Sequence, residues 1–174
     1  MNIATNLEWS ARYFPQRPAI SQDGTTIRYA ELDLTANRVA TALIGLNVEP
    51  GDHIGLYAPN SGDWIAFYFG ALKAGVVPVT LSSQLSRDEL SLLLNHCRPR
   101  MIFTSPEALE RLEGFRASGG LEKIICPGGD LDMKQLTEMG SASFTALDRN
   151  REDIAAVLYT GGTTRYAQGR FAQP

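Results

Sequence analysis

Cysteine and long hydrophobic runs are scarce in this sequence of 174 residues. Its two cysteines, Cys97 and Cys126, lie far apart without paired spacing, which excludes a disulfide framework and a cysteine-based zinc site. We interpret both as small buried hydrophobic residues in a reducing compartment, so a cytoplasmic protein is expected. The most apolar window, residues 64–81, is interrupted by two glycines, a lysine and a proline, so no transmembrane segment is expected.

Clustered positive charge and targeting patterns are missing as well. The formal net charge is −3 and no lysine or arginine cluster occurs, which disfavours nucleic acid and anionic membranes as partners. The first apolar residues are interrupted by Asn2, Asn6 and Glu8, so we expect no targeting segment. A hydrophobic content of 44% excludes intrinsic disorder, and the length fits one domain.

Three common site signatures are also missing. A Walker A loop needs a lysine directly after its last glycine, and the chain contains no Gly-Lys pair. It contains neither the Gly-x-Gly-x-x-Gly run of dinucleotide-binding proteins nor the Gly-x-Ser-x-Gly nucleophile elbow. We assign no catalytic residue and no metal ligand.

What is present is an alternation of strand and helix patterns, which predicts an α/β fold with a mostly parallel sheet and flanking helices. A hairpin is expected around Asp23-Gly24, and capping residues at Ser61 and Ser86 indicate helix starts. The expected strands are 19–22, 25–29, 53–58, 76–81, 101–104, 121–126 and 154–159, and the expected helices are 31–46, Ser61 to 74, Ser86 to Cys97, 106–115 and 133–138.

Several polar and aromatic residues receive structural interpretations. Asp33 and Asn37 are expected on the water-facing side of their helix, opposite its apolar stripe. Lys73, near the end of a buried helix, is expected to extend its ammonium group toward water. Trp9 and Trp64 are interpreted as packing residues.

One segment contains residues suited to binding an anion. The run Thr160-Gly161-Gly162-Thr163-Thr164 follows a buried strand. Its glycines let backbone N–H groups converge on an anion, and its threonine hydroxyls add short donors. Hydrogen bonds to charged oxygens contribute about 1.5–3 kcal/mol each, so these five residues are a candidate polyphosphate-binding loop, with a polar turn as the alternative.

Residues 158–164 resemble the phosphate-loop signature Tyr-Thr-Ser-Gly-Thr-Thr-Gly-x-Pro-Lys-Gly of the adenylate-forming superfamily, in which the loop joins two strands. That superfamily includes acyl-CoA synthetases, adenylation domains and luciferases. Gly161 stands where serine is commoner, which costs one hydroxyl but no backbone donor. Further blocks are similar in order and spacing, at residues 26–33, 36–40, 48–56, 59–60 and 69–79.

The resemblance implies that residues 1–164 are the N-terminal portion of an AMP-binding domain, an incomplete part of the family's large domain. It implies a carboxylate–CoA ligase of the kind found in fatty acid metabolism. Such an enzyme joins a carboxylic acid to AMP and then passes the acyl group to coenzyme A. It also implies ATP with Mg²⁺ as cofactors, held at the phosphates by Thr160, Gly161, Gly162, Thr163 and Thr164.

The pattern breaks after Thr164, where Arg165-Tyr-Ala-Gln-Gly169 replaces Gly-x-Pro-Lys-Gly. With one choice of codons, reading one base later from Arg165 gives Gly-Met-Pro-Lys-Gly. Residues 165–174 are therefore interpreted as a non-matching, out-of-frame tail, with a divergent loop as the alternative. The strand ending at Tyr159 is then expected to expose an unpaired edge.

Because the acyl pocket, adenine motif and mobile lid of the family have no counterpart here, we expect the isolated chain to be inactive. Two other functions stay open. The chain could be a non-catalytic remnant or interaction module on the same scaffold, or a small nucleotide-binding domain that is complete in itself.

Overall fold

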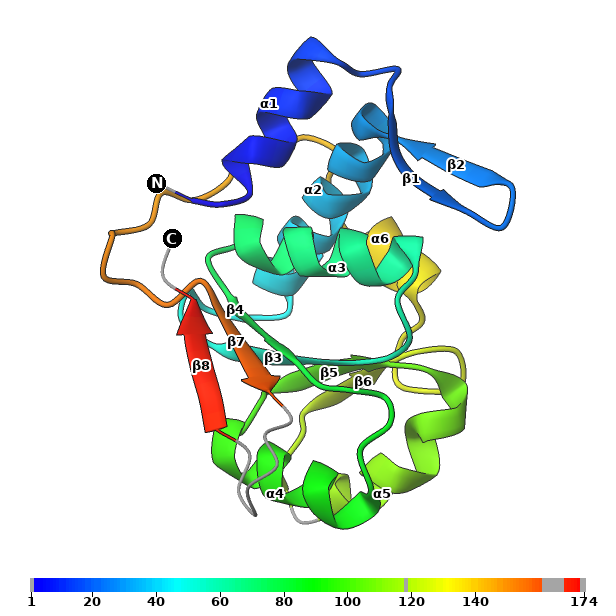
Figure 1. The fold of residues 1–174 in the computed structure, drawn as a ribbon, viewed down its shortest axis with the longest axis vertical. Coiled ribbons are helices and arrows are strands. Elements are labelled where there is room, and N and C mark those ends of the chain that lie inside the picture. Colours follow the sequence, from blue (N-terminus) through cyan, green and yellow to red (C-terminus); the bar gives the residue numbers. More distant parts are fainter. Residues whose placement is uncertain (1, 118, 161–167, 173–174) are drawn as a thin grey trace.

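The computed structural model describes residues 2–117, 119–160 and 168–172. Helices and strands alternate along the chain, as the sequence pattern predicted (Figure 1). The helices are α1 (Thr5–Tyr13), α2 (Tyr29–Gly45), α3 (Gly62–Lys73), α4 (Arg87–Cys97), α5 (Leu109–Ala117, preceded by the 3₁₀ turn Pro106–Ala108) and α6 (Met133–Met139). The strands are β1 (Pro18–Gln22), β2 (Thr25–Arg28), β3 (His53–Tyr57), β4 (Val77–Thr80), β5 (Met101–Thr104), β6 (Lys123–Ile125), β7 (Ala156–Thr160) and β8 (Gln168–Ala172).

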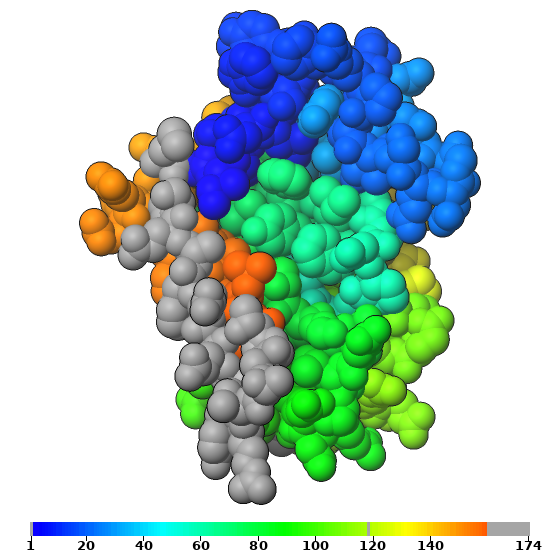
Figure 2. Space-filling view, in the orientation of Figure 1, coloured from blue at the N-terminus to red at the C-terminus, as the bar shows by residue number. Residues whose placement is uncertain are grey.

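The main sheet has the strand order β6-β5-β3-β4-β7-β8. Its first five strands are parallel, and β8 is antiparallel to β7. Strands β1 and β2 form a separate antiparallel hairpin, which α1 accompanies at one end of the molecule's long axis (Figure 2). The predicted α/β architecture with a mostly parallel sheet is therefore confirmed.

Helices cover both faces of the sheet (Figure 1). On one face, Ile54 and Leu56 of β3 pack in a buried cluster with α2 and α3, including Phe67. On the other face, Tyr57 and Ile102 share a second buried cluster with α4 and α5. Successive strand residues point to opposite faces, and a parallel sheet covered on both faces is built from nearly continuous apolar strands.

The predicted helix starts at Ser61 and Ser86 are confirmed. The Ser61 side chain accepts a hydrogen bond from the Trp64 N–H, and Ser86 forms a reciprocal capping box with Glu89. After α3, Gly75 has a φ of 70°, a left-handed conformation that glycine adopts without strain. The bonds of Ser61 and Ser86 fix the first residues of α3 and α4, and the conformation of Gly75 ends α3.

Two features near the ends of the chain differ from what the sequence indicated. Helix α1 was not predicted. Its Trp9, predicted to be a packing residue, is 56% exposed and packs only locally, against the rings of Tyr13 and Phe14. Strand β7 does not have an unpaired edge, because β8 pairs with it from Thr160↔Gln168 to Ala156↔Ala172. A backbone ladder needs only N–H and C=O groups, so a tail whose side chains depart from the family pattern can still supply the strand.

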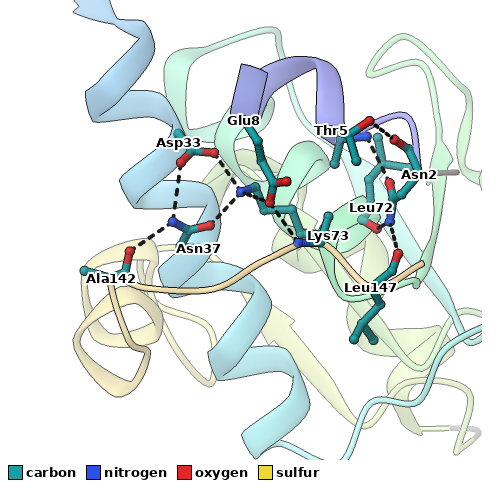
Figure 3. Close-up of polar contacts among 11 residues, drawn as sticks. Asn2, Thr5, Glu8, Asp33, Asn37, Leu72, Lys73, Ala142 and Leu147 are labelled. Atoms are coloured by element: carbon teal, nitrogen blue, oxygen red, sulfur yellow. Dashed lines mark hydrogen bonds and ion pairs between the residues drawn. The ribbon is translucent and has the colours of Figure 1, made fainter. Parts of the chain in front are cut away.

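The interpretation of Lys73, Asp33 and Asn37 as water-facing residues is also wrong. Lys73 is fully buried, and Asn37 is buried as well. The Lys73 Nζ lies 2.7 Å from Asp33 Oδ1 and 2.9 Å from Glu8 Oε1, and it donates to Asn37 Oδ1 at 2.7 Å (Figure 3). A buried ammonium group is stable only when paired, and two carboxylates and one amide oxygen supply the pairing.

Candidate functional site

The carboxyl ends of the parallel strands β3, β4 and β7 lie next to one another at one edge of the sheet. The chain leaves β3 into α3 on one face and leaves β4 into α4 on the opposite face. The next strand, β5, then pairs on the far side of β3. The strand order thus reverses between β3 and β5, and ligands in open α/β sheets bind beyond the carboxyl ends of the strands.

A hollow of about 600 Å³ lies at this edge, beyond the ends of β3, β4 and β7. Segments after β3 and β4 form its walls, together with one side of α3 and the end of β7. Its size falls within the roughly 300–1,000 Å³ typical of small-molecule sites. The lining residues are Ala58, Pro59, Asn60, Trp64, Tyr68, Thr80, Leu81, Ser82, Ser83, Leu158 and Tyr159.

Helix α3 contributes an aromatic wall to this hollow. The rings of Trp64 and Tyr68 are stacked, with centroids 5.5 Å apart and an interplanar angle of 6°. Burial raises the pKa of Tyr68, so its hydroxyl stays protonated at neutral pH. The hollow also contains polar groups. These are the amide of Asn60 and the hydroxyls of Ser82 and Ser83, which can donate hydrogen bonds to phosphate or carboxylate oxygens.

The end of β7 is fastened to α4 by a polar contact. The Tyr159 hydroxyl is hydrogen-bonded to His96 Nδ1 at 2.7 Å, and the Cys97 thiol lies within hydrogen-bonding reach of the same hydroxyl. Burial raises the pKa of Tyr159 to about 12, and the neighbouring Cys97 adds to this shift. Tyr159 is therefore a neutral phenol. Its bond to His96 anchors the end of β7 directly before the predicted phosphate loop.

The predicted site residues begin at the point where β7 ends. Thr160 is the last residue of β7 and pairs with Gln168, while Gly161, Gly162, Thr163 and Thr164 lie outside the described residues. The structure thus places the entrance of the predicted loop beside the hollow. The hollow itself was not predicted, although Asn60 and the serines after β4 are the polar residues at strand ends that could have indicated it.

Within the described part of the chain, no group of three or more His, Cys, Asp or Glu residues could hold a metal ion. Among those same residues, no helix is long and apolar enough to cross a membrane.

Comparison with known protein families decides the affiliation. The family described as AMP-binding enzyme matches residues 7–165, which is most of the chain and includes the predicted loop. The chain belongs to the AMP-binding enzyme family. This confirms the resemblance to the adenylate-forming superfamily.

The curated relatives of this AMP-binding chain include several carboxylate–CoA ligases. It is 26% identical over 172 residues to the long-chain-fatty-acid–CoA ligase FadD13 of Mycobacterium tuberculosis, covering 97% of this chain and 34% of the relative. It is 31% identical over 153 residues to a 4-hydroxybenzoate–CoA/benzoate–CoA ligase of Rhodopseudomonas palustris, covering 83% and 28%. The chain therefore spans about a third of the length of the relatives it matches.

Solved structures give the same result. The anthranilate–CoA ligase AuaEII, determined in complex with anthranoyl-AMP, matches with a TM-score of 0.93 and 26% identity. The match covers 99% of this chain and 35% of that protein. A benzoate–CoA ligase from Burkholderia xenovorans matches with a TM-score of 0.87 and 25% identity, over 99% of this chain and 34% of that protein.

Proposed function

We propose that this AMP-binding chain is the N-terminal portion of a cytoplasmic, ATP-dependent carboxylate–CoA ligase and carries its phosphate-binding loop. The observation that supports this most is the position of the Thr160–Thr164 motif. It directly follows β7 in the sequence, and Leu158 and Tyr159 of β7 line the hollow at the carboxyl edge of the sheet. The CoA ligases among the relatives support the class of reaction, with a carboxylic acid, ATP and CoA as its substrates.

The residues at the sheet edge fit a bound nucleotide. Backbone N–H groups of Gly161 and Gly162 and the hydroxyls of Thr160, Thr163 and Thr164 would hold the phosphates of ATP. The hollow at the end of β7 has room for a small molecule and contains both an aromatic wall and neutral donors. When bound, ATP with Mg²⁺ supplies the adenylyl group that activates the acid.

The nucleotide sequence around Thr164 tests whether residues 165–174 are out of frame. We expect a reading frame shifted by one base to continue the family pattern with Gly-x-Pro-Lys-Gly and to encode the rest of the ligase. Codons that cannot give this pattern in another frame contradict the frameshift. A stop with no ligase sequence downstream would favour the alternative, a non-catalytic remnant or interaction module.

Isotope exchange between ATP and pyrophosphate tests the reaction. The 174-residue chain should show no carboxylate-dependent exchange, whereas the protein with the restored frame should show it. In that longer protein, Gly162→Val should abolish exchange, because its side chain fills the space where backbone amides approach the phosphates. Ser91→Ala, at an exposed position on α4, is the matched control and should keep full exchange.

ATP-dependent thermal stability separates the remaining alternative. A complete nucleotide-binding domain would unfold cooperatively at a midpoint that rises with ATP concentration. The absence of such a rise in the 174-residue chain, together with exchange by the longer protein, is the result that our proposal requires.

A further inference from the structure

The Lys73 cluster joins parts of the chain that are far apart in sequence. Glu8 comes from α1, Asp33 and Asn37 from α2, and Lys73 is the last residue of α3 (Figure 3). The same groups also bind residues 140–147, which we call the strap. The strap contains no helix or strand and leads from α6 toward β7.

Two residues near the N-terminus hold the strap directly. Glu8 Oε1 accepts a hydrogen bond from the Ala146 N–H at 2.8 Å, in addition to its ion pair with Lys73. Asn2 donates through Nδ2 to the Leu147 carbonyl at 2.9 Å and to the Leu72 carbonyl at 2.6 Å. Asn2 and Glu8 therefore each bind a residue of α3 and a residue of the strap.

Helices α2 and α3 supply the rest of the attachment. The Lys73 carbonyl accepts from the Leu147 N–H at 2.8 Å, and Asn37 Nδ2 donates to the Ala142 carbonyl at 2.9 Å. Thr41 Oγ1 accepts from the Ser141 N–H at 2.7 Å. Every one of these bonds joins a side chain or a helix end to the backbone of the strap.

Apolar burial adds little to this attachment. Leu7 is the buried residue within α1, while Trp9 and Tyr13 are both 56% exposed. In the strap, Phe144 is partly buried against the core and Leu147 is partly exposed. Segments with few buried apolar contacts open at lower free energy than the core of a domain.

We propose that α1 and the strap form one cooperative unit, fastened by the Lys73 cluster, that opens from the α2–α3 layer without unfolding of the sheet. Glu8 couples the two parts because one of its oxygens contacts both Lys73 and the strap. Opening of the unit exposes the Lys73 cluster and frees the segment that leads into β7. The inference is independent of the proposed ligase function.

Hydrogen exchange in the 174-residue chain tests the proposal, with Glu8→Ala as the main variant. Lys73 keeps Asp33 and Asn37 as partners in this variant, so the sheet should stay folded. An isolated helix as short as α1 is marginal in water, so protection of its amides reports its docking. We expect exchange to accelerate roughly tenfold to a hundredfold in both α1 and the strap, with β3 and β5 unchanged.

Glu138→Ala is the matched control, because Glu138 lies on α6 in an exposed pair with Lys134. It should leave exchange in α1 and the strap unchanged. If Glu8→Ala does not fold, Glu8→Gln replaces it. Glu8→Gln retains an acceptor oxygen and should accelerate the same two segments by a smaller factor.

Two results would overturn the proposal. Acceleration in the strap without acceleration in α1 would show that the two segments open independently. Equal acceleration in α1, the strap, β3 and β5 would show that Glu8 contributes only to the global stability of the fold.

Discussion

At the scale of single residues, the C-terminal end of α4 contains a position under backbone strain. Arg98 has a φ of 43°, in the left-handed region that costs a side-chain-bearing residue about 1 kcal/mol or more. Its backbone N–H nevertheless caps the helix by donating to the Leu94 carbonyl. Glycine adopts this conformation without that cost.

Arg98→Gly should therefore raise the free energy of unfolding by about 1 kcal/mol, measured by urea denaturation. Asn47→Gly is the matched control, because Asn47 also has a positive φ, of 60°. Asparagine tolerates this region better than arginine, so its replacement should give a smaller gain. An equal gain at both positions would contradict the strain argument.

Residues whose partners are close in sequence could be predicted, and those with distant partners could not. Ser61 bonds to a residue three positions away, so a local rule finds it. Lys73 finds its acceptors 65 and 36 positions away, at Glu8 and Asn37. Helical periodicity places each of these residues on a face but does not show that the faces meet.

At the scale of elements, the crossing of α2 and α3 depends on a close approach at Gly70. A Cβ at this position would lie 2.5 Å from Val39 Cβ and 3.0 Å from the Ala36 carbonyl oxygen. Gly70→Ala should lower the free energy of unfolding by about 2 kcal/mol, because it overpacks the helix crossing. Chemical denaturation measures this loss.

Gly114→Ala, on α5, is the control for the same substitution. A Cβ there meets nothing within 4 Å, so the higher helix propensity of alanine should stabilise the protein by up to about 1 kcal/mol. Opposite signs at the two glycines are expected, and destabilisation of similar size at both would contradict the packing argument.

Most helices and strands of the described chain could be predicted because their apolar periodicity matches their burial. Helix α1 lacks that match, because Glu8 is turned inward to Lys73 while Trp9 and Tyr13 are exposed. Strand β8 lacks a side-chain signal, since it joins the sheet through its backbone ladder with β7. In both cases tertiary contacts decide the structure.

At the scale of the whole molecule, burial of Cys97 should make the free energy of unfolding fall as the pH becomes alkaline. Burial raises the pKa of the Cys97 thiol to about 11 from its ordinary value of 9.0, although the hydrogen bond with Tyr159 opposes this shift. The unfolded chain ionises this thiol at a lower pH than the folded chain. The contribution of the thiol is fully present below pH 9 and is lost as pH rises to about 11.

Urea denaturation between pH 8 and pH 11 should show the free energy of unfolding falling across this window. In Cys97→Ala the fall should be shallower, because the buried thiol no longer titrates. Identical slopes in the variant and the original chain would contradict this assignment.

The candidate site illustrates the same division between local and distant information. The phosphate-loop motif could be found in the sequence, because its residues are consecutive. The hollow could not, because its walls come from segments after β3 and β4, one side of α3 and the end of β7. Only the strand order brings these walls to one edge.

The position of β7 in the sheet also constrains the order in which the fold can assemble. Its Val157 pairs with Val79 of β4, whereas β3 and β4 are joined through a single helix. Contacts between distant segments carry a larger loop-closure entropy and form later than local ones. We therefore expect the strand that leads to the proposed nucleotide loop to be the last parallel strand to join, after its docking place has been built.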